Sequence, residues 1–416
     1  MKKLLFLFTV DFPFGKSEAS FLPSELKYVA PLFDKVHLFP FILPQEQLKQ
    51  ALPKNVETEA VFSRLECKRP KLTLRLVFQI NRVLISEFLH CNNKIGFIKS
   101  IRAHISQLLN YSFYANALAD YLYSQNINLK HCVFYTYWFD EWSSIIAWLK
   151  CYVPGYKNLQ LVSRAHGFDL YHYRHQAGYI FPRQLQINAV NKLVLISKNG
   201  NNYMTRHFPK QVKKMALSRL AIEKPVDKDN VNTISDRPIY TIVSCSEMVA
   251  VKRLHLIVDI LNLIDLDIRW IHFGEGKLMS SLRTQCDSLP KNIQVEFKGY
   301  VENADLLQFY QHNQVDFLIN VSESEGIPVS MMEAISYGIP IVATDVGGVS
   351  EIVSTDMGIL LDKEFSAEKA ASQIKHFLLN KNQNLEKNLM KYWQEHYSAE
   401  KNYSQFANIL VECVND

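Results

Sequence analysis

The stretch at residues 315–353 constrains the fold of this chain more than any other. It begins with an apolar run that predicts a buried strand. A loop follows, in which Pro328 opens a short helix that Gly338 ends. A second apolar run, at residues 339–344, predicts the next strand, and the glycine loop after it predicts a further helix. Strands that alternate with helices in this way predict an open parallel α/β sheet.

Two carboxylates in this stretch, Glu325 and Glu333, suit a ligand at the start of the helix. A helix N-terminus presents free backbone N–H groups and a partial positive charge, which favours a diphosphate. Carboxylates beside it accept hydrogen bonds from sugar hydroxyls. Because a nucleotide sugar has hydroxyls on both sides of its diphosphate, the arrangement favours such a ligand. The alternative is that Glu325 is a solvated loop residue and Glu333 a solvated helix residue.

With the glycines that follow them, these carboxylates resemble the donor-site signature of the retaining glycosyltransferases of family 4, within group 1. The resemblance implies the GT-B fold, which is two doubly wound parallel-sheet α/β domains facing a cleft. It implies transfer of a sugar from a nucleoside-diphosphate sugar to a hydroxyl of a glycan or lipid-linked oligosaccharide, with the anomeric configuration kept. Capsule, exopolysaccharide and lipopolysaccharide assembly use such reactions.

The resemblance also assigns residues to the donor diphosphate. Lys252 matches the family's lysine, whereas the family's arginine position falls on Ser246 or Glu247, so we expect Arg253 to take over that charge. No metal ion or other cofactor is expected, because Lys252, Arg253 and the helix N-terminus would stabilise the leaving diphosphate. The expected catalytic residues are His166, Lys252 and Glu325. The expected donor-binding residues are Arg253, Gly274, Glu325, Gly326, Ile327, Pro328, Val329 and Glu333.

In the first half of the chain, His166 and Gly15 lie where predicted strands end, which is where open sheets collect their ligands. The family's matching histidine lies close to the donor sugar; the alternative is a hydrogen-bonded structural histidine. Arg164 and Asp169 are expected to brace this loop as an ion pair. Gly15 is expected in the acceptor site, where the family has paired glycines, or else in a simple turn.

A length of 416 residues predicts two domains. We expect an N-terminal acceptor-binding domain at 1–222, a linker at 223–237, a donor-binding domain at 238–390, and C-terminal helices at 391–416 that cross back to the first domain.

Charge and cysteines bear on partners and compartment. The net charge of +5 is mild, so no nucleic acid is expected as a partner. Seven cysteines without a C-x-x-C pair favour reduced thiols in the cytoplasm. The apolar start of the chain is interrupted by Asp11 and Pro13, so it predicts a strand and not a signal peptide.

A basic amphipathic segment at residues 64–102 is open to two interpretations. It either lies on anionic lipid headgroups, which would make the protein peripheral on the inner face of the plasma membrane, or packs as a helix pair with its charges solvated. Its basic residues are Arg64, Lys68, Arg69, Lys71, Arg75, Arg82, Lys94, Lys99 and Arg102.

Three other functions remain open at this point. A nucleotide-sugar epimerase could share the fold, a phosphorylase would carry pyridoxal on a lysine, and a non-catalytic assembly scaffold would use only the basic segment. The epimerase would release product without an acceptor, the phosphorylase would show the absorbance of its cofactor, and the scaffold would tolerate Glu325→Ala.

Overall fold

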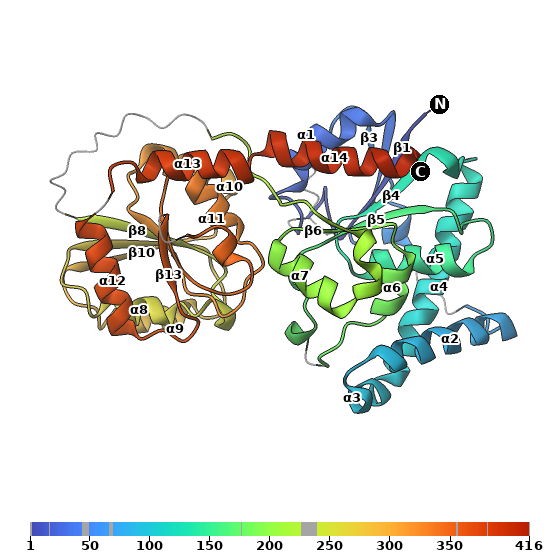
Figure 1. The fold of residues 1–416 in the computed structure, drawn as a ribbon, viewed down its shortest axis with the longest axis horizontal. Coiled ribbons are helices and arrows are strands. Elements are labelled where there is room, and N and C mark those ends of the chain that lie inside the picture. Colours follow the sequence, from blue (N-terminus) through green and yellow to red (C-terminus); the bar gives the residue numbers. More distant parts are fainter. Residues whose placement is uncertain are drawn as a thin grey trace. The chain divides into compact units, whose positions relative to one another are not determined.

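A computed structural model describes residues 2–15, 17–43, 50–65, 70–175, 177–225, 239–354, 357–380 and 382–415 of the chain. The chain forms two compact units, an N-terminal unit of Met1–Leu220 with Glu400–Asp416, and a C-terminal unit of Ala221–Ala399. Each unit is built on a parallel sheet covered by helices (Figure 1). The predicted class, two doubly wound parallel-sheet α/β domains, is therefore confirmed. From residue 226 onward the predicted linker lies outside the described residues.

The sheet of the N-terminal unit is parallel and reverses its strand order between β1 and β4. Its five central strands are short, mostly apolar runs buried from both faces, as parallel sheets require, while the two edge strands are more exposed. In sheet order the described strands are β3 (Val56–Thr58), β2 (Lys35–Pro40), β1 (Leu4–Thr9), β4 (Cys132–Thr136), β5 (Gln160–Ala165), β6 (Lys192–Leu195) and β7 (Met215–Leu217).

Alternate residues of β1 serve two different cores, because successive side chains of a strand point to opposite faces. Phe6 and Phe8 belong to the core that includes Trp142 of α5, while Leu5 and Leu7 pack with Phe406 of α14. The helices of this unit are α1 (Leu22–Val29), α2 (Leu74–His90), α3 (Lys94–Lys99), α4 (Ile101–Ser124), α5 (Glu141–Tyr152), α6 (Arg183–Ala189), α7 (Lys198–His207) and α14 (Ala399–Asn415). Short 3₁₀ turns are η1 (Ala30–Leu32), η2 (Phe62–Arg64), η3 (Leu129–His131), η4 (His172–Arg174) and η5 (Pro209–Lys214).

The sheet of the C-terminal unit is also parallel, and its order reverses between β8 and β11. In sheet order the described strands are β10 (Ile293–Gly299), β9 (Ile268–Phe273), β8 (Tyr240–Cys245), β11 (Phe317–Asn320), β12 (Ile341–Thr344) and β13 (Gly358–Leu361). The helices are α8 (His255–Leu261), α9 (Met279–Cys286), α10 (Asn303–His312), α11 (Val329–Ser336), α12 (Ala367–Leu379) and α13 (Leu385–His396), with 3₁₀ turns η6 (Ala250–Lys252) and η7 (Val349–Glu351).

Two predictions about this unit need correction. The glycine loop after β12 opens only the turn η7 and not a helix; the β-branched residues Val349, Ile352 and Val353 have low helical propensity. The segment 391–416 is not one block that crosses back. Its first residues complete α13, which packs against α11 of the C-terminal unit, and only α14 packs on the N-terminal sheet.

Within the described residues, no helix is both long enough and apolar enough to cross a bilayer.

A fully buried ion pair ties β5 to α1 and α14. Arg164 on β5 lies 3.1 Å from a carboxylate oxygen of Glu25, which also accepts a hydrogen bond from the Tyr135 hydroxyl. The Arg164 guanidinium stacks on the Phe406 ring of α14 at 3.9 Å. The expected partner of Arg164 was Asp169, and this expectation is wrong because the side chain points to the sheet face covered by α1 and α14.

We expect Arg164→Met to lower the free energy of unfolding of the N-terminal unit by about 3–5 kcal/mol, because it leaves Glu25 buried without its cation. Urea denaturation followed by circular dichroism measures this change. The double variant Arg164→Met/Glu25→Gln should regain part of the loss. The exposed pair of Lys35 and Glu57 provides the control, and Lys35→Met should cost less than about 1 kcal/mol. Equal losses of unfolding free energy for Arg164→Met and Lys35→Met would contradict the argument.

Candidate functional site

The candidate site lies at the carboxyl ends of β8 and β11, where the strand order of the C-terminal sheet reverses and where open sheets bind ligands. Lys252 ends η6 in the loop after β8, and Glu325 lies in the loop between β11 and α11. The Lys252 ammonium is 2.6 Å from Glu325 Oε1. The fold thus brings together two residues that are 73 positions apart in the sequence.

The Lys252–Glu325 pair is only partly open to solvent. The side chains are 23% and 10% exposed, respectively. The amide nitrogen of Asn320, the last residue of β11, also donates to Glu325 Oε1, at 3.3 Å. An ammonium group has three N–H donors. Lys252 can therefore bind an anionic oxygen of a ligand while its carboxylate partner stays anchored by Asn320.

The N-terminus of α11 adds backbone donors beside this pair. Pro328 is the N-cap residue, with an extended backbone, and no side chain caps the N–H groups that begin at Val329. Such N–H groups and the helix dipole favour an anion. The side chain of Ile327, just before Pro328, is buried and anchors the loop that leads into the helix. Gly338, whose φ is +70°, ends the helix where the sequence predicts.

Close contact between two backbone segments positions Glu325. At Gly347, with φ of +60°, a Cβ atom would lie 1.9 Å from the Glu325 carbonyl oxygen. The N–H of Gly348 donates to the Gly326 carbonyl at 2.9 Å. The glycine pair after β12 thus lets its loop pack directly on the backbone that carries Glu325 and Gly326.

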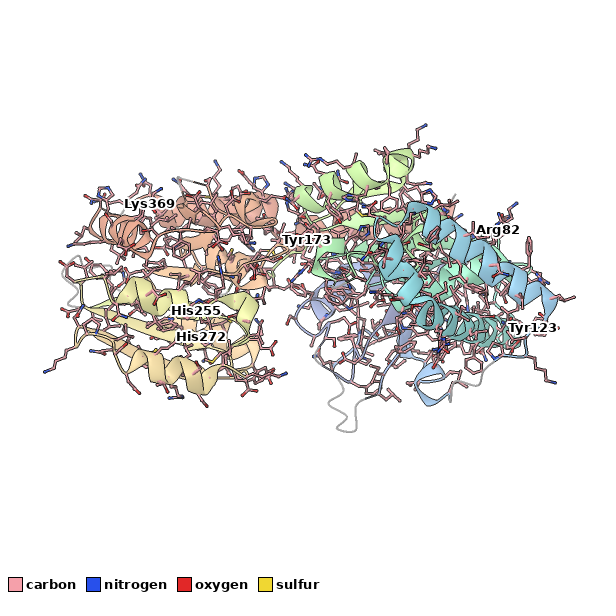
Figure 2. The ribbon with its side chains drawn as sticks, turned by 90° about the horizontal axis from the view of Figure 1, so that it is seen from below. Arg82, Tyr123, Tyr173, His255, His272 and Lys369 are labelled. Atoms are coloured by element: carbon pink, nitrogen blue, oxygen red, sulfur yellow. The ribbon has the colours of Figure 1, made fainter. Side chains whose placement is uncertain are left out.

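Gly274 permits a second close approach, between the loops after β8 and β9. Its φ is +134°, and a Cβ atom would lie 2.0 Å from the Ser246 carbonyl oxygen. The His272 ring, labelled in Figure 2, bonds to the Ser244 hydroxyl through Nδ1 and to the same Ser246 carbonyl through Nε2. Burial lowers the pKa of His272 to about 4, so this imidazole is neutral. Gly274 and His272 therefore fix the backbone at Ser246, which is one of the two positions on which the family's arginine falls.

The Arg253 side chain contacts the backbone of neighbouring loops. Its backbone is left-handed, with φ of +48°, which turns the side chain toward the neighbouring loops. The guanidinium donates to the backbone carbonyls of Val321, Ser322 and Lys363. Its charge therefore braces the loops after β11 and β13. The expectation that Arg253 replaces the missing arginine stays a prediction.

Glu333 is buried on α11, at 4% exposure, and accepts a hydrogen bond from the amide nitrogen of Asn303 at 2.6 Å. Burial raises the pKa of Glu333 to about 7, and the bond from Asn303 opposes that rise. Glu325 is also buried, at 8%. The alternative that both carboxylates are solvated surface residues is therefore wrong.

His166 lies in the N-terminal unit, at the carboxyl end of β5. Its ring packs on Trp138 and Tyr137, with centroids 4.2 and 4.9 Å away. Its backbone N–H donates to Asp169, whose other carboxylate oxygen is 3.5 Å from Nδ1. Burial would raise the pKa of Asp169, but the contacts with His166 lower it overall. Asp169 therefore fixes the orientation of this histidine.

Gly15 forms a tight turn after β1. Its N–H donates to the Asp11 carbonyl, and the Asp11 carboxylate fills the space that a Cβ atom would occupy. This geometry is that of a turn glycine, and an acceptor-binding role for Gly15 stays a prediction.

Sequence reasoning missed three polar residues that hold these loops. Asn320 lies near the end of a predicted strand, and this position could have indicated a site residue. Asn303 is 30 positions from its partner Glu333, so no local pattern links the two. Glu18 resembles a solvated turn residue in the sequence. In the structure it is buried and accepts bonds from the Val10 N–H and the Trp138 indole.

Asp265 and Asp267 have the D-x-D spacing of a metal-binding motif but lie away from the site. They precede β9, at the amino edge of the sheet, and Asp265 pairs with Lys375. Across the described ranges, no group of three or more His, Cys, Asp or Glu residues is placed to hold a metal ion. The expectation of a metal-free site stays a prediction.

We expect Gly347→Ala to lower the free energy of unfolding, because its methyl group collides with the Glu325 carbonyl. Gly299→Ala is the matched control: φ there is +69° and no atom lies within 4 Å of the added Cβ. The control should cost about 1–2 kcal/mol from backbone strain, and Gly347→Ala about 2 kcal/mol more from overpacking. Thermal denaturation of the two variants and the wild type measures both losses. Equal stability of the two variants would contradict the proposed loop contact.

Part of this chain matches the model of a known protein family. Residues 227–396 match the model of the family glycosyl transferases group 1. The O-antigen biosynthesis glycosyltransferase WbnH of Escherichia coli is 32% identical over 102 residues, which is 22% of this chain and 28% of that protein. The putative colanic acid biosynthesis glycosyltransferase WcaL of Escherichia coli K12 is 26% identical over 177 residues, which is 39% of this chain and 42% of that protein. The chain thus matches less than half the length of these curated relatives.

Solved structures resemble both units. The lipopolysaccharide outer core galactosyltransferase WaaB has a TM-score of 0.68 at 12% identity, over 98% of this chain and 99% of that one. Anabaena Alr3699/HepE in complex with UDP-glucose has a TM-score of 0.62 at 14% identity, over 99% of this chain and 100% of that one. At such identities the likeness concerns the fold alone, which is the GT-B fold of glycosyltransferases. The matched segment 227–396, which includes Lys252, Glu325 and Glu333, is thus similar to the glycosyl transferases of group 1.

Proposed function

We propose that this protein is a glycosyltransferase of surface-polysaccharide assembly. It moves a sugar from a nucleoside-diphosphate sugar to a hydroxyl of a glycan or lipid-linked oligosaccharide and retains the anomeric configuration. The observation that carries this proposal is the Lys252–Glu325 pair beside the uncapped N-terminus of α11. Relatives named for O-antigen and colanic acid biosynthesis support it, as does the UDP-glucose in the HepE structure.

The chemical demand of the reaction is a stable leaving group. The bond between the anomeric carbon and the diphosphate oxygen breaks, and its electron pair stays on the diphosphate. Fixed positive charge at this position lowers the barrier, because it needs no rearrangement as the negative charge develops. Lys252 and the N–H groups at the start of α11 supply that charge without a metal ion. His166 is proposed to act near the donor sugar, and this role rests on the resemblance.

The two carboxylates have separate tasks in this proposal. Glu325 accepts hydrogen bonds from hydroxyls of the donor sugar, and its fixed contacts with Lys252 and Asn320 suit an anchor better than a nucleophile. Glu333 accepts hydrogen bonds from the ribose. Its present partner is the neutral amide of Asn303. Ribose hydroxyls would therefore favour its ionised form.

Lys252→Ala tests the donor site directly. Bound nucleoside diphosphate raises the melting temperature of a folded protein by mass action. We expect UDP, GDP or ADP to stabilise the wild type but not this variant, and kcat/KM for transfer to fall by about 10²-fold or more. Lys363→Ala is the control, because Lys363 follows β13 and pairs with Glu323 while both side chains remain about half exposed.

Each protein is compared with its own ligand-free form, so a loss of intrinsic stability in Lys252→Ala does not obscure the result. An equal nucleotide shift in Lys252→Ala and Lys363→Ala would remove Lys252 from the donor site. No shift of the wild type with any nucleoside diphosphate, together with no sugar transfer, would overturn the proposed function. Product formed without an acceptor would indicate an epimerase instead.

Glu333→Gln should stabilise the protein at high pH. The pKa of Glu333 is about 7 in the folded state, against 4.5 for an ordinary Glu. Its burial therefore lowers the stability of the protein progressively as the pH rises from 4.5 to about 7, and the full loss of stability is present above about 7. The variant should therefore gain up to about 3 kcal/mol at pH 8 and nothing below pH 4.5, since one pKa unit corresponds to about 1.4 kcal/mol.

Thermal denaturation at several pH values measures this difference. Glu323→Gln is the matched control, because the Glu323 side chain is 56% exposed and should show no such pH dependence. A stability difference between Glu333→Gln and the wild type that does not change with pH would contradict the argument.

A further inference from the structure

The outer face of α2 carries an apolar stripe that no other part of the described chain covers. Leu74, Phe78, Ile85 and Leu89 are 92%, 69%, 61% and 68% exposed. Their spacing puts them on one side of the helix. The opposite side faces the core of the N-terminal unit through Leu76, Ile80, Val83 and Leu84. The helix is thus apolar on both sides, and only one side is needed for folding.

The stripe continues onto neighbouring residues and forms the largest such cluster. Of the 22 large apolar side chains exposed among the described residues, nine lie within residues 72–105. In α3 these include Ile95 and Ile98, at 70% and 58% exposure. Figures 1 and 2 show α2 and α3 together at one side of the N-terminal unit. Apolar side chains that gather on one protruding element indicate an interaction surface.

The exposed charges of the segment that carries the stripe are of one sign. Residues 70–106 contain a single carboxylate, Glu87, and it is fully buried. Arg82, labelled in Figure 2, and Lys99 are exposed. Within the described residues, no ion pair to a carboxylate neutralises the basic side chains of this segment, which are Lys71, Arg75, Arg82, Lys94, Lys99 and Arg102. A surface of this kind is complementary to a negatively charged one.

Glu87 also attaches α2 to the rest of the N-terminal unit through hydrogen bonds. Its carboxylate accepts hydrogen bonds from the backbone N–H groups of Gln184 and Leu185 at the start of α6, and from the Tyr179 hydroxyl. The amide of Asn93, the N-cap of α3, donates to the Ala177 carbonyl at 3.1 Å. These contacts join the helix pair to the loop that follows β5 in the same unit.

We propose that α2 and α3 dock the protein on an anionic lipid bilayer. The apolar stripe enters the boundary between headgroups and acyl chains, and the flanking basic side chains bind the headgroup phosphates. Apolar burial combined with attraction to anionic lipid is how interfacial helices bind membranes. The uniformly positive surroundings favour a lipid surface over a protein partner. This inference does not depend on the sugar-transfer proposal, because it concerns a different surface.

Co-sedimentation of the full chain with vesicles tests the surface. We expect binding to phosphatidylglycerol–phosphatidylethanolamine vesicles at low salt, weaker binding at high salt, and little binding to phosphatidylcholine vesicles. The variant Phe78→Ser/Leu89→Ser should lose binding. Arg82→Glu/Lys99→Glu should weaken it at least about tenfold, since each cation contributes on the order of 1 kcal/mol. Leu379→Ser, at a site 55% exposed on α12, is the control and should bind like the wild type.

The positions substituted in the two double variants, Phe78, Leu89, Arg82 and Lys99, are all exposed. The melting temperature and the UDP-induced shift of each variant should therefore match those of the wild type. A wild type that ignores anionic vesicles at low salt would overturn the proposal, and so would variants that bind as well as the Leu379→Ser control. Self-association that Phe78→Ser/Leu89→Ser abolishes, without vesicle binding by the wild type, would assign the face to contacts between copies and also overturn it.

Discussion

The candidate site depends on backbone segments that approach each other more closely than any side chain would allow. Gly347 meets the Glu325 carbonyl, and Gly274 meets the Ser246 carbonyl. These two contacts hold the loops after β12 and β9 against the loops that carry Glu325 and Lys252. An ion pair between two loops keeps a fixed geometry only if both loops are fixed. The glycines therefore determine where the charges of the site lie, although they carry none.

Around this frame, the protein supports each polar group with a neighbour of a different kind. Glu325 has a cation and an amide as partners, and Glu333 has an amide. Arg253, the basic residue next to Lys252, binds only carbonyls and a distant carboxylate of its own unit. Lys252 and the start of α11 are therefore the positive groups of this unit for which we propose contact with an anionic ligand.

Much of this fold is readable from the sequence, because local rules determine it. Pro328 and Gly338 bound α11 as predicted, since each restricts the backbone by itself. The resemblance assigned Lys252 and Glu325 to one donor site but did not predict that they pair, because the two residues come from different loops. Three features were beyond local rules: the left-handed backbone that redirects Arg253, the bond from Asn303 to Glu333, and the division of the C-terminal segment between two units.

One contact lies where the chain enters and leaves the C-terminal unit. Ile222, which enters the C-terminal unit, pairs with the residues that leave it: its N–H donates to the Tyr397 carbonyl, and its own carbonyl accepts from the Ala399 N–H. The C-terminal unit is therefore an insertion whose two ends lie side by side. Replacing it by a homologous unit would require only two adjacent junctions. The C-terminal unit, for which we propose donor binding, therefore has the chain topology of an exchangeable cassette.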